Sequence, residues 1–221
     1  RRDYFIKEWI ESLDPGSSLL DAGAGFQRYK KYAINLNYVS QDFAKYEGGE
    51  ISGGVKVTNW NSKECDIICD IAKIPRDDSS FDNIMCNEVF EHLPNPQEAL
   101  TELSRLMKRG GRILITAPYR CHSHQEPFFF YTGFSTELYK HYARENNLKF
   151  VKIIPNGNYY NELIEELINF CTANNWLHQI TSLFLLFPFM CVLNIMARTS
   201  STTTNPLASK SCVGYFVILE K

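Results

Sequence analysis

The feature that most constrains the fold is a short apolar run that leads directly into a glycine-rich turn, SSLLDAGAG at residues 17–25. The apolar part is too short for a core helix, and it ends at Asp21, just before Gly23 and Gly25. A strand followed by a glycine-rich turn is how an α/β sheet meets a nucleotide-like ligand at its carboxyl edge. Glycine lets the backbone approach such a ligand closely. A plain tight turn between a strand and a helix has the same local sequence, so the rest of the chain must decide.

Strand and helix patterns alternate along much of the 221-residue chain. This alternation is typical of a doubly wound, Rossmann-like α/β sheet, and the length fits one domain over residues 1–221. Helices are expected at residues 3–13, 27–33 and 136–146, and one more begins at Asn95 and ends at residues 108–111. Strands are expected at residues 17–21, 36–40, 66–70, 81–86, 112–117, 149–154 and 213–219.

A long polar segment at residues 43–63 interrupts this pattern. We expect an exposed loop, with a hairpin around Gly53 and Gly54. A loop of this length is more often functional or mobile than neutral.

A second departure is an insertion at about residues 156–211, before the last strand. It begins with an amphipathic helix at 159–173 and continues into the apolar run LFLLFPFMCVL at 183–193. A spanning helix needs about 20 such residues, and Pro188 interrupts this run. We therefore predict a buried helical cover on the substrate side. The alternative is an interfacial membrane patch or an apolar acceptor pocket, to which Phe184, Phe187 and Phe189 are expected to contribute.

Composition narrows the functional classes. The formal net charge of −2 gives no electrostatic argument for nucleic-acid binding. Seven cysteines occur without a Cys-x-x-Cys pair or zinc-like spacing, which favours reduced thiols and a cytoplasmic chain. No metal-ligand pattern stands out, and no signal peptide follows the basic start of the chain. The sequence does not indicate an oligomeric state.

Acidic residues at predicted strand ends point to the cofactor. A dinucleotide fingerprint needs a third small residue, and here that position is Arg28, which disfavours a diphosphate. Asp42, at the end of the second strand, suits the two hydroxyls of a ribose. Asp70, after the third, could meet an adenine amino group. Three acids at one edge would suit a cationic, phosphate-free nucleoside such as S-adenosylmethionine.

On these motifs the sequence resembles the class I S-adenosylmethionine-dependent methyltransferases, in the broad group that includes ubiquinone-biosynthesis methyltransferases. The resemblance rests on LLDAGAG, on VSQD, on the run from DIICDIAKIP to RILITAPY, and on the final hydrophobic strand. It covers roughly residues 10–155. It implies a seven-stranded sheet with an antiparallel last strand.

The resemblance also implies positions for the cofactor. It places Asp21, Gly23 and Gly25 around the methionine part, Asp42 at the ribose, Asp70 and Ile71 near the adenine, and Asn87 at the pocket after the fourth strand. The segment at residues 43–63 is longer than is usual in the family. The resemblance therefore does not predict what covers the ribose.

We expect methyl transfer to a small-molecule acceptor, such as a saccharide or a lipid-linked intermediate. The alternatives are a non-catalytic S-adenosylmethionine-binding module and an NAD-dependent oxidoreductase, which Arg28 disfavours. An oxygen nucleophile would need a base. The candidates are His92 in EVFEHLP and His122 or His124 in APYRCHSHQEP, and a structural role is the alternative for each. Glu88 and Glu91 are predicted to be solvated or structural rather than catalytic.

Overall fold

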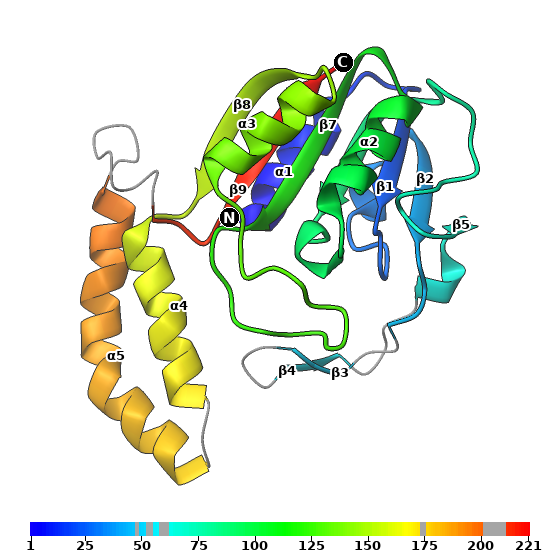
Figure 1. Ribbon diagram of the computed structural model, residues 1–221. Coiled ribbons are helices and arrows are strands. Elements are labelled where there is room, and N and C mark those ends of the chain that lie inside the picture. Colours follow the sequence, from blue (N-terminus) through cyan, green and yellow to red (C-terminus); the bar gives the residue numbers. More distant parts are fainter. Residues whose placement is uncertain (47–48, 52–54, 58–61, 173–175, 201–210) are drawn as a thin grey trace.

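The computed structural model describes residues 1–46, 49–51, 55–57, 62–172, 176–200 and 211–221, and its centre is a seven-stranded sheet (Figure 1). The strand order is β5-β2-β1-β6-β7-β9-β8. The last strand in the chain, β9, runs antiparallel to both of its neighbours, whereas β5, β2, β1, β6 and β7 are parallel. This confirms the predicted fold class. The strands are β1 Ser18–Ala22, β2 Asn37–Asp42, β5 Ile67–Ile68, β6 Phe81–Asn87, β7 Met107–Pro118, β8 Lys149–Asn156 and β9 Gly214–Glu220.

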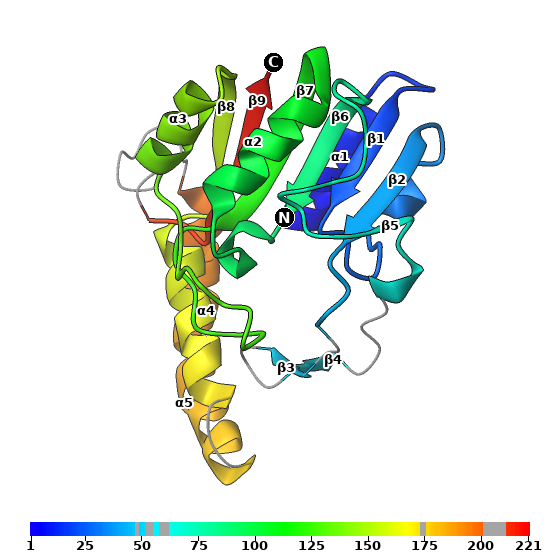
Figure 2. The same ribbon diagram turned by 45° about the vertical axis from the view of Figure 1, so that its right-hand side comes forward.

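Helices cover both faces of this sheet. The first helix, α1 (Arg2–Glu11), lies on one face, while α2 (Pro96–Leu106) and α3 (Thr136–Glu145) lie on the other (Figures 1 and 2). Successive residues of a strand point to opposite faces. Accordingly, Leu19 packs in the core beneath α1, and Leu20 packs in the larger core beneath α2.

The segment after the glycine-rich turn is not the helix expected at residues 27–33. Only a 3-10 turn, η1 (Lys30–Tyr32), forms there. Gln27 adopts a left-handed conformation with φ of 56°, which breaks a helix at its start. Asp3 of α1 then accepts hydrogen bonds from Arg28 and from the Tyr29 hydroxyl, which holds the segment against α1.

The long segment between β2 and β5 contains two short antiparallel strands, β3 (Gly49–Ile51) and β4 (Val55–Val57). This confirms a hairpin in the segment, although Gly53 and Gly54 themselves lie outside the described residues. The chain therefore alternates strand and helix less regularly than the sequence pattern predicts. Among the described residues no α-helix separates β1 from β2 or β2 from β5.

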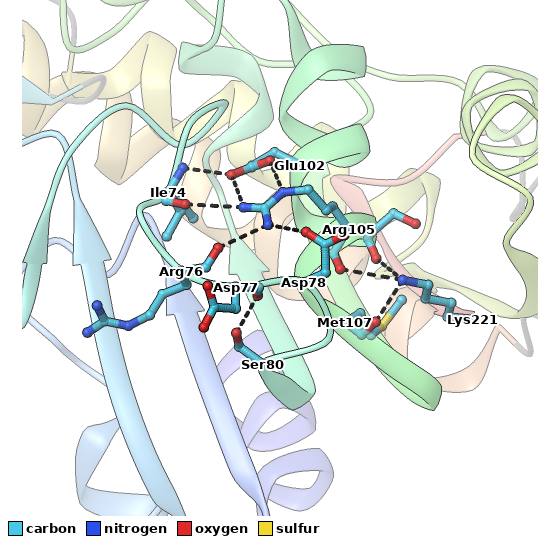
Figure 3. Close-up of polar contacts among 10 residues, drawn as sticks. Ile74, Arg76, Asp77, Asp78, Ser80, Glu102, Arg105, Met107 and Lys221 are labelled. Atoms are coloured by element: carbon cyan, nitrogen blue, oxygen red, sulfur yellow. Dashed lines mark hydrogen bonds and ion pairs between the residues drawn. The ribbon is translucent and has the colours of Figure 1, made fainter.

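Arg105, in the last turn of α2, fastens the connection from β5 to β6 (Figure 3). Its guanidinium donates to Glu102, to Asp78 and to the backbone carbonyls of Arg76 and Ile74. Nearby, the ammonium of Lys221 donates to three backbone carbonyls at the end of α2 and the start of β7. The network therefore ties α2, the connection and the chain's last residue together.

We expect Arg105→Gln to lower the free energy of unfolding by about 1 kcal/mol, because charged hydrogen bonds are lost but a third of the side chain is screened by solvent. Denaturant unfolding measures this change. The control is Lys140→Gln, which removes an exposed pair with Glu137 within one helix and should leave stability unchanged. Equal stability of all three proteins would contradict the role given to Arg105.

The insertion forms a helical hairpin that projects away from the sheet (Figures 1 and 2). Its helices are α4 (Tyr159–Thr172) and α5 (Trp176–Thr199), and Pro188 lies inside α5 rather than ending it. The prediction of a buried cover at residues 183–193 is wrong. Phe184 is 80% exposed and Leu185 is 73% exposed, because α5 packs along α4 and not over the core.

Candidate active site

The glycine-rich turn after β1 is hydrogen-bonded to the end of β2. The backbone amide of Gly25 donates to one oxygen of the Asp42 carboxylate (2.9 Å), and the amide of Ala44 donates to the other (2.8 Å). Gly23 donates its amide to the Gln41 carbonyl (2.8 Å). Asp42 is nearly fully buried, and this burial raises the pKa of its carboxyl, although the backbone amides act in the opposite direction. The carboxyl edges of β1 and β2 thus form one rigid unit.

Gly23 is required by the protein's own packing. Its φ of +75° is a left-handed conformation, and a Cβ there would lie 2.4 Å from Cγ2 of Val89. Val89 follows β6, so the turn packs closely against the next strand's connection. The sequence predicts a glycine here for close approach of the cofactor, and the contact with Val89 is a second reason for it.

Asp21 is buried and faces its neighbour on β2. Its carboxylate accepts a hydrogen bond from the Tyr38 hydroxyl (2.6 Å), and burial raises its pKa to about 7. Contact between Asp21 and the methionine part of a cofactor therefore stays a prediction, since the carboxylate is engaged inside the protein.

The predicted adenine-side residues lie just after β5. Asp70 is exposed, and its carboxylate accepts from the amide of Ala72 (2.9 Å), whereas Ile71 is buried in the main core. The strand ends at Ile68, earlier than the sequence pattern suggested, so both residues belong to the following turn. Their position at the same sheet edge as Asp42 agrees with the prediction; their contact with adenine is untested.

Polar groups converge where β6 and β7 end. The Thr116 hydroxyl lies 2.8 Å from Oδ1 of Asn87 and 2.9 Å from Oε1 of Glu88. Glu88 has a left-handed backbone with φ of 52°, an uncommon conformation for a residue with a side chain, and its carboxylate pairs with Arg2 at 2.5 Å. Backbone strain of this kind is common at functional sites.

A cavity of about 230 Å³ opens beside these residues, between the ends of β6 and β7, the start of β9 and helix α4. Its charged lining comprises Arg2, Glu88, Glu91, Arg120, His122, His124, Glu162, Glu165 and Glu166. Carboxylates dominate this lining. Arg2, Arg120 and the residues of the insertion were not predicted for this site, because no local motif connects them to the strand ends. Phe184, Phe187 and Phe189, which were expected at an acceptor pocket, do not line the cavity.

Two of these lining residues, Glu91 and His124, form a cluster with His92 at the edge of the cavity. One ligand atom from each lies within 4.8 Å of the others. Nδ1 of His92 lies 2.6 Å from the Phe128 carbonyl, and Nδ1 of His124 lies 2.9 Å from the His122 carbonyl. Because a carbonyl only accepts, Nδ1 is the donor in both rings, and Nε2 keeps its lone pair in the neutral form.

Glu91 is buried, which rules out a solvated side chain and agrees with the predicted structural role. It is 1% exposed, its Oε2 has no hydrogen-bond partner among the described residues, and burial raises its pKa well above the usual value. Two imidazoles and a carboxylate are a donor set that could serve acid–base chemistry or hold a divalent transition metal. No metal-ligand pattern is visible in the sequence, because His124 comes from a distant loop.

His92 and His124 differ in their surroundings. Burial lowers the pKa of His92 to about 4, with a smaller contribution from His124. His92 is absent from the cavity lining, whereas His124 belongs to it. Of the two candidate bases, His124 is therefore the better placed to meet an acceptor.

Comparison with known proteins identifies the family to which the residues at this sheet edge are similar. Residues 20–115, which carry the glycine-rich turn, Asp42, the β6 end and β7, match the family model described as a methyltransferase domain. Residues 20–115 belong to a methyltransferase domain. Its sheet order, with β9 antiparallel between β7 and β8, agrees with that assignment.

Curated relatives of this methyltransferase domain are distant and longer. The ubiquinone biosynthesis O-methyltransferase of Ralstonia nicotianae is 26% identical over 122 residues, which cover 51% of this chain and 49% of the relative. The human protein named "Probable tRNA methyltransferase 9B" is 25% identical over 114 residues, which cover 50% of this chain and 23% of the relative. The chain thus spans half or less of these relatives.

Solved structures share the fold at low identity. A SAM-dependent methyltransferase from Archaeoglobus fulgidus superposes with a TM-score of 0.59 and 16% identity, covering 100% of this chain and 93% of the other. The [4+2]-cyclase SpnF superposes equally well, with a TM-score of 0.59 and 12% identity, covering 98% and 80%. The same fold therefore carries more than one reaction, and the activity must be argued from the site.

The site of this methyltransferase domain suits a nucleoside without phosphates. Each Asp42 oxygen accepts one backbone amide and keeps a lone pair for a ribose hydroxyl. A diphosphate needs a helix N-terminus after the turn, and only the three-residue η1 follows here. The guanidinium of Arg28 donates a hydrogen bond to the Asp3 carboxylate on α1. The residues present thus fit S-adenosylmethionine better than a dinucleotide.

The low pKa of His92 predicts a pH dependence of stability. The unfolded chain binds a proton at His92 below about pH 6.5, and the folded chain does so only near pH 4, so stability falls as the pH drops through this window. We expect His92→Gln to reduce that loss by about 1 kcal/mol per pH unit. Urea unfolding at several pH values measures it. The control is His141→Gln, an exposed residue of α3; equal slopes in the parent and His92→Gln would contradict the burial argument.

Proposed function

We propose that the chain transfers a methyl group from S-adenosylmethionine to a small-molecule acceptor. The observation that carries this proposal is the Asp42 carboxylate bound to the Gly25 amide at the carboxyl edge of the methyltransferase domain. This arrangement supports a ribose beside the turn, and the short η1 turn offers no helix N-terminus to a diphosphate. Bound there, the cofactor would supply an electrophilic methyl group on its sulfonium.

The chain's own part in such a reaction is to bind and orient. Asp42 would accept hydrogen bonds from the ribose hydroxyls, with Asp70 and Ile71 on the adenine side and Asn87 at the end of β6. A sulfonium is already a good methyl donor, so alignment of donor and nucleophile supplies much of the rate.

The acidic cavity supports a polar acceptor group. Glu88 and Glu162 pair with Arg2 and Arg120, but each carboxylate has further lone pairs, which favour a ligand with hydroxyl or other donor groups. A saccharide or a lipid-linked intermediate has this chemistry. The lining has more carboxylates than arginines, so it gives no electrostatic support to a tRNA acceptor such as the name of the human relative suggests.

His124 is the proposed base for an oxygen acceptor. It lines the cavity, and its Nδ1 hydrogen bond leaves Nε2 able to take a proton. The rival reading is a domain that binds S-adenosylmethionine without transferring methyl. Release of S-adenosylhomocysteine in the presence of candidate acceptors separates the two.

We expect Asp42→Asn to weaken S-adenosylmethionine binding roughly 10- to 100-fold, because a charge-assisted hydrogen bond to the ribose becomes a neutral one. Calorimetric titration measures the affinity. Asparagine keeps the size of the side chain and one acceptor oxygen for the turn. The control is Asp77→Asn, an exposed residue near the Arg105 network, and unchanged affinity in Asp42→Asn would remove this residue from the site.

We expect His124→Ala to lower turnover by roughly 10²- to 10⁴-fold while cofactor affinity holds, because an oxygen acceptor would lose its base. An assay of S-adenosylhomocysteine release measures turnover, and His92→Ala ranks the two histidines. His141→Ala is the matched control on the surface. Turnover of His124→Ala within a few-fold of the parent would exclude it as the base.

A further inference from the structure

The hairpin of α4 and α5 carries most of the large apolar side chains that are exposed among the described residues. Helix α5 has 24 residues, and a window within its segment Gln179–Thr199 is only 11% buried. Its exposed apolar side chains are Ile180, Leu183, Phe184, Leu185, Phe187, Phe189, Val192, Ile195 and Met196. Monomeric soluble proteins rarely expose contiguous apolar patches of this kind unless the patch has a partner.

The distribution of these side chains around α5 indicates a hydrocarbon environment rather than a protein groove. At 100° per residue, the exposed apolar positions cover well over half of the helix circumference. The buried positions, Ser182 and Leu193, lie on the narrow remaining stripe toward α4. A helix that docks in a groove buries one apolar stripe and keeps a polar one. Here the inward stripe holds only Ser182 and Leu193, and the apolar residues lie mainly on the outward side.

Charge is absent from the hairpin except near the domain. No Asp, Glu, Lys or Arg occurs at residues 167–197, although 22% of the chain is charged. The acids of α4 lie within its first eight residues, where Glu162 pairs with Arg120 and Glu166 pairs with His122. The second half of α4 exposes Ile168 and Phe170 instead. The hairpin thus has a charged base at the domain. Its far part, the described residues 167–172 and 176–190, carries no charged side chain and is called the tip.

The connections of the hairpin decide how it could enter a bilayer. Its base joins β8 to β9, which are paired neighbours with Asn156 opposite Gly214. Asn158 also donates a hydrogen bond to the Ala197 carbonyl, which holds the end of α5 beside the start of α4. Entry and exit therefore lie on the same side of a membrane. The 14 residues of α4, with acids among the first eight, are too few for a second span.

We propose that the α4–α5 hairpin inserts its tip into one leaflet of a lipid bilayer as a monotopic anchor. Helix α4 also lines the acidic cavity through Glu162 and Asn169. An inserted tip would therefore hold this cavity next to the membrane surface. Resting on the proposed function, this position favours an acceptor whose polar group sits on a lipid.

Vesicle flotation tests the anchor without any methyl acceptor. We expect the purified full chain to float with vesicles of phosphatidylcholine alone, to do so equally with added phosphatidylglycerol, and to resist high salt, because insertion depends on apolar contact. The variant Phe184→Asp/Leu185→Asp should partition at least tenfold less, since each change places a charge in hydrocarbon. Both side chains are exposed, so the fold should be retained.

The matched control is Tyr4→Asp/Ile34→Asp, which changes two exposed apolar residues of the domain (67% and 81% exposed) and should float like the parent. A parent that stays in the dense fraction would overturn the proposal, as would a Phe184→Asp/Leu185→Asp protein that floats equally well. A lipid-free dimer that does not float would assign the surface to a second copy of the chain and also overturn it. S-adenosylmethionine titration of the same proteins is independent: loss of cofactor binding in all of them would contradict the proposed function and leave the flotation result intact.

Discussion

The hydrogen bonds from the Gly25 and Ala44 amides to the buried Asp42 carboxylate hold the site together. They fix the turn after β1 to the end of β2, and Gly23 packs that turn against Val89 beyond β6. A charged acceptor in a buried position makes these bonds stronger than neutral ones. The three strands that form the carboxyl edge therefore keep their relative positions before any ligand arrives, which reduces the ordering cost of binding.

Much of this edge could be predicted from sequence because its determinants are local. The apolar run before Asp21, the acid at Asp42 and the β6–α2–β7 succession each depend on neighbouring residues. The helix expected at residues 27–33 could not be excluded in this way, because Arg28 and Tyr29 are held by Asp3 of α1. Likewise, only the fold brings His124 beside Glu91 and His92.

The position of the insertion could not be predicted from its sequence. Its apolar run predicts a buried cover, because a soluble domain normally buries such residues. In the structure α5 lies along α4 and leaves Phe184 and Leu185 in contact with solvent. The same hairpin contributes Glu162, Glu165 and Glu166 to the cavity. The part of the chain that departs most from a common methyltransferase domain thus shapes both the candidate acceptor site and the candidate membrane contact.

We propose that the edge formed by Asp42 and the glycine-rich turn binds S-adenosylmethionine. The direct test is calorimetric titration of the parent chain with S-adenosylmethionine and, separately, with NAD. We expect saturable one-to-one binding of S-adenosylmethionine and no binding of NAD. Saturable binding of NAD, with no heat from S-adenosylmethionine, would contradict it.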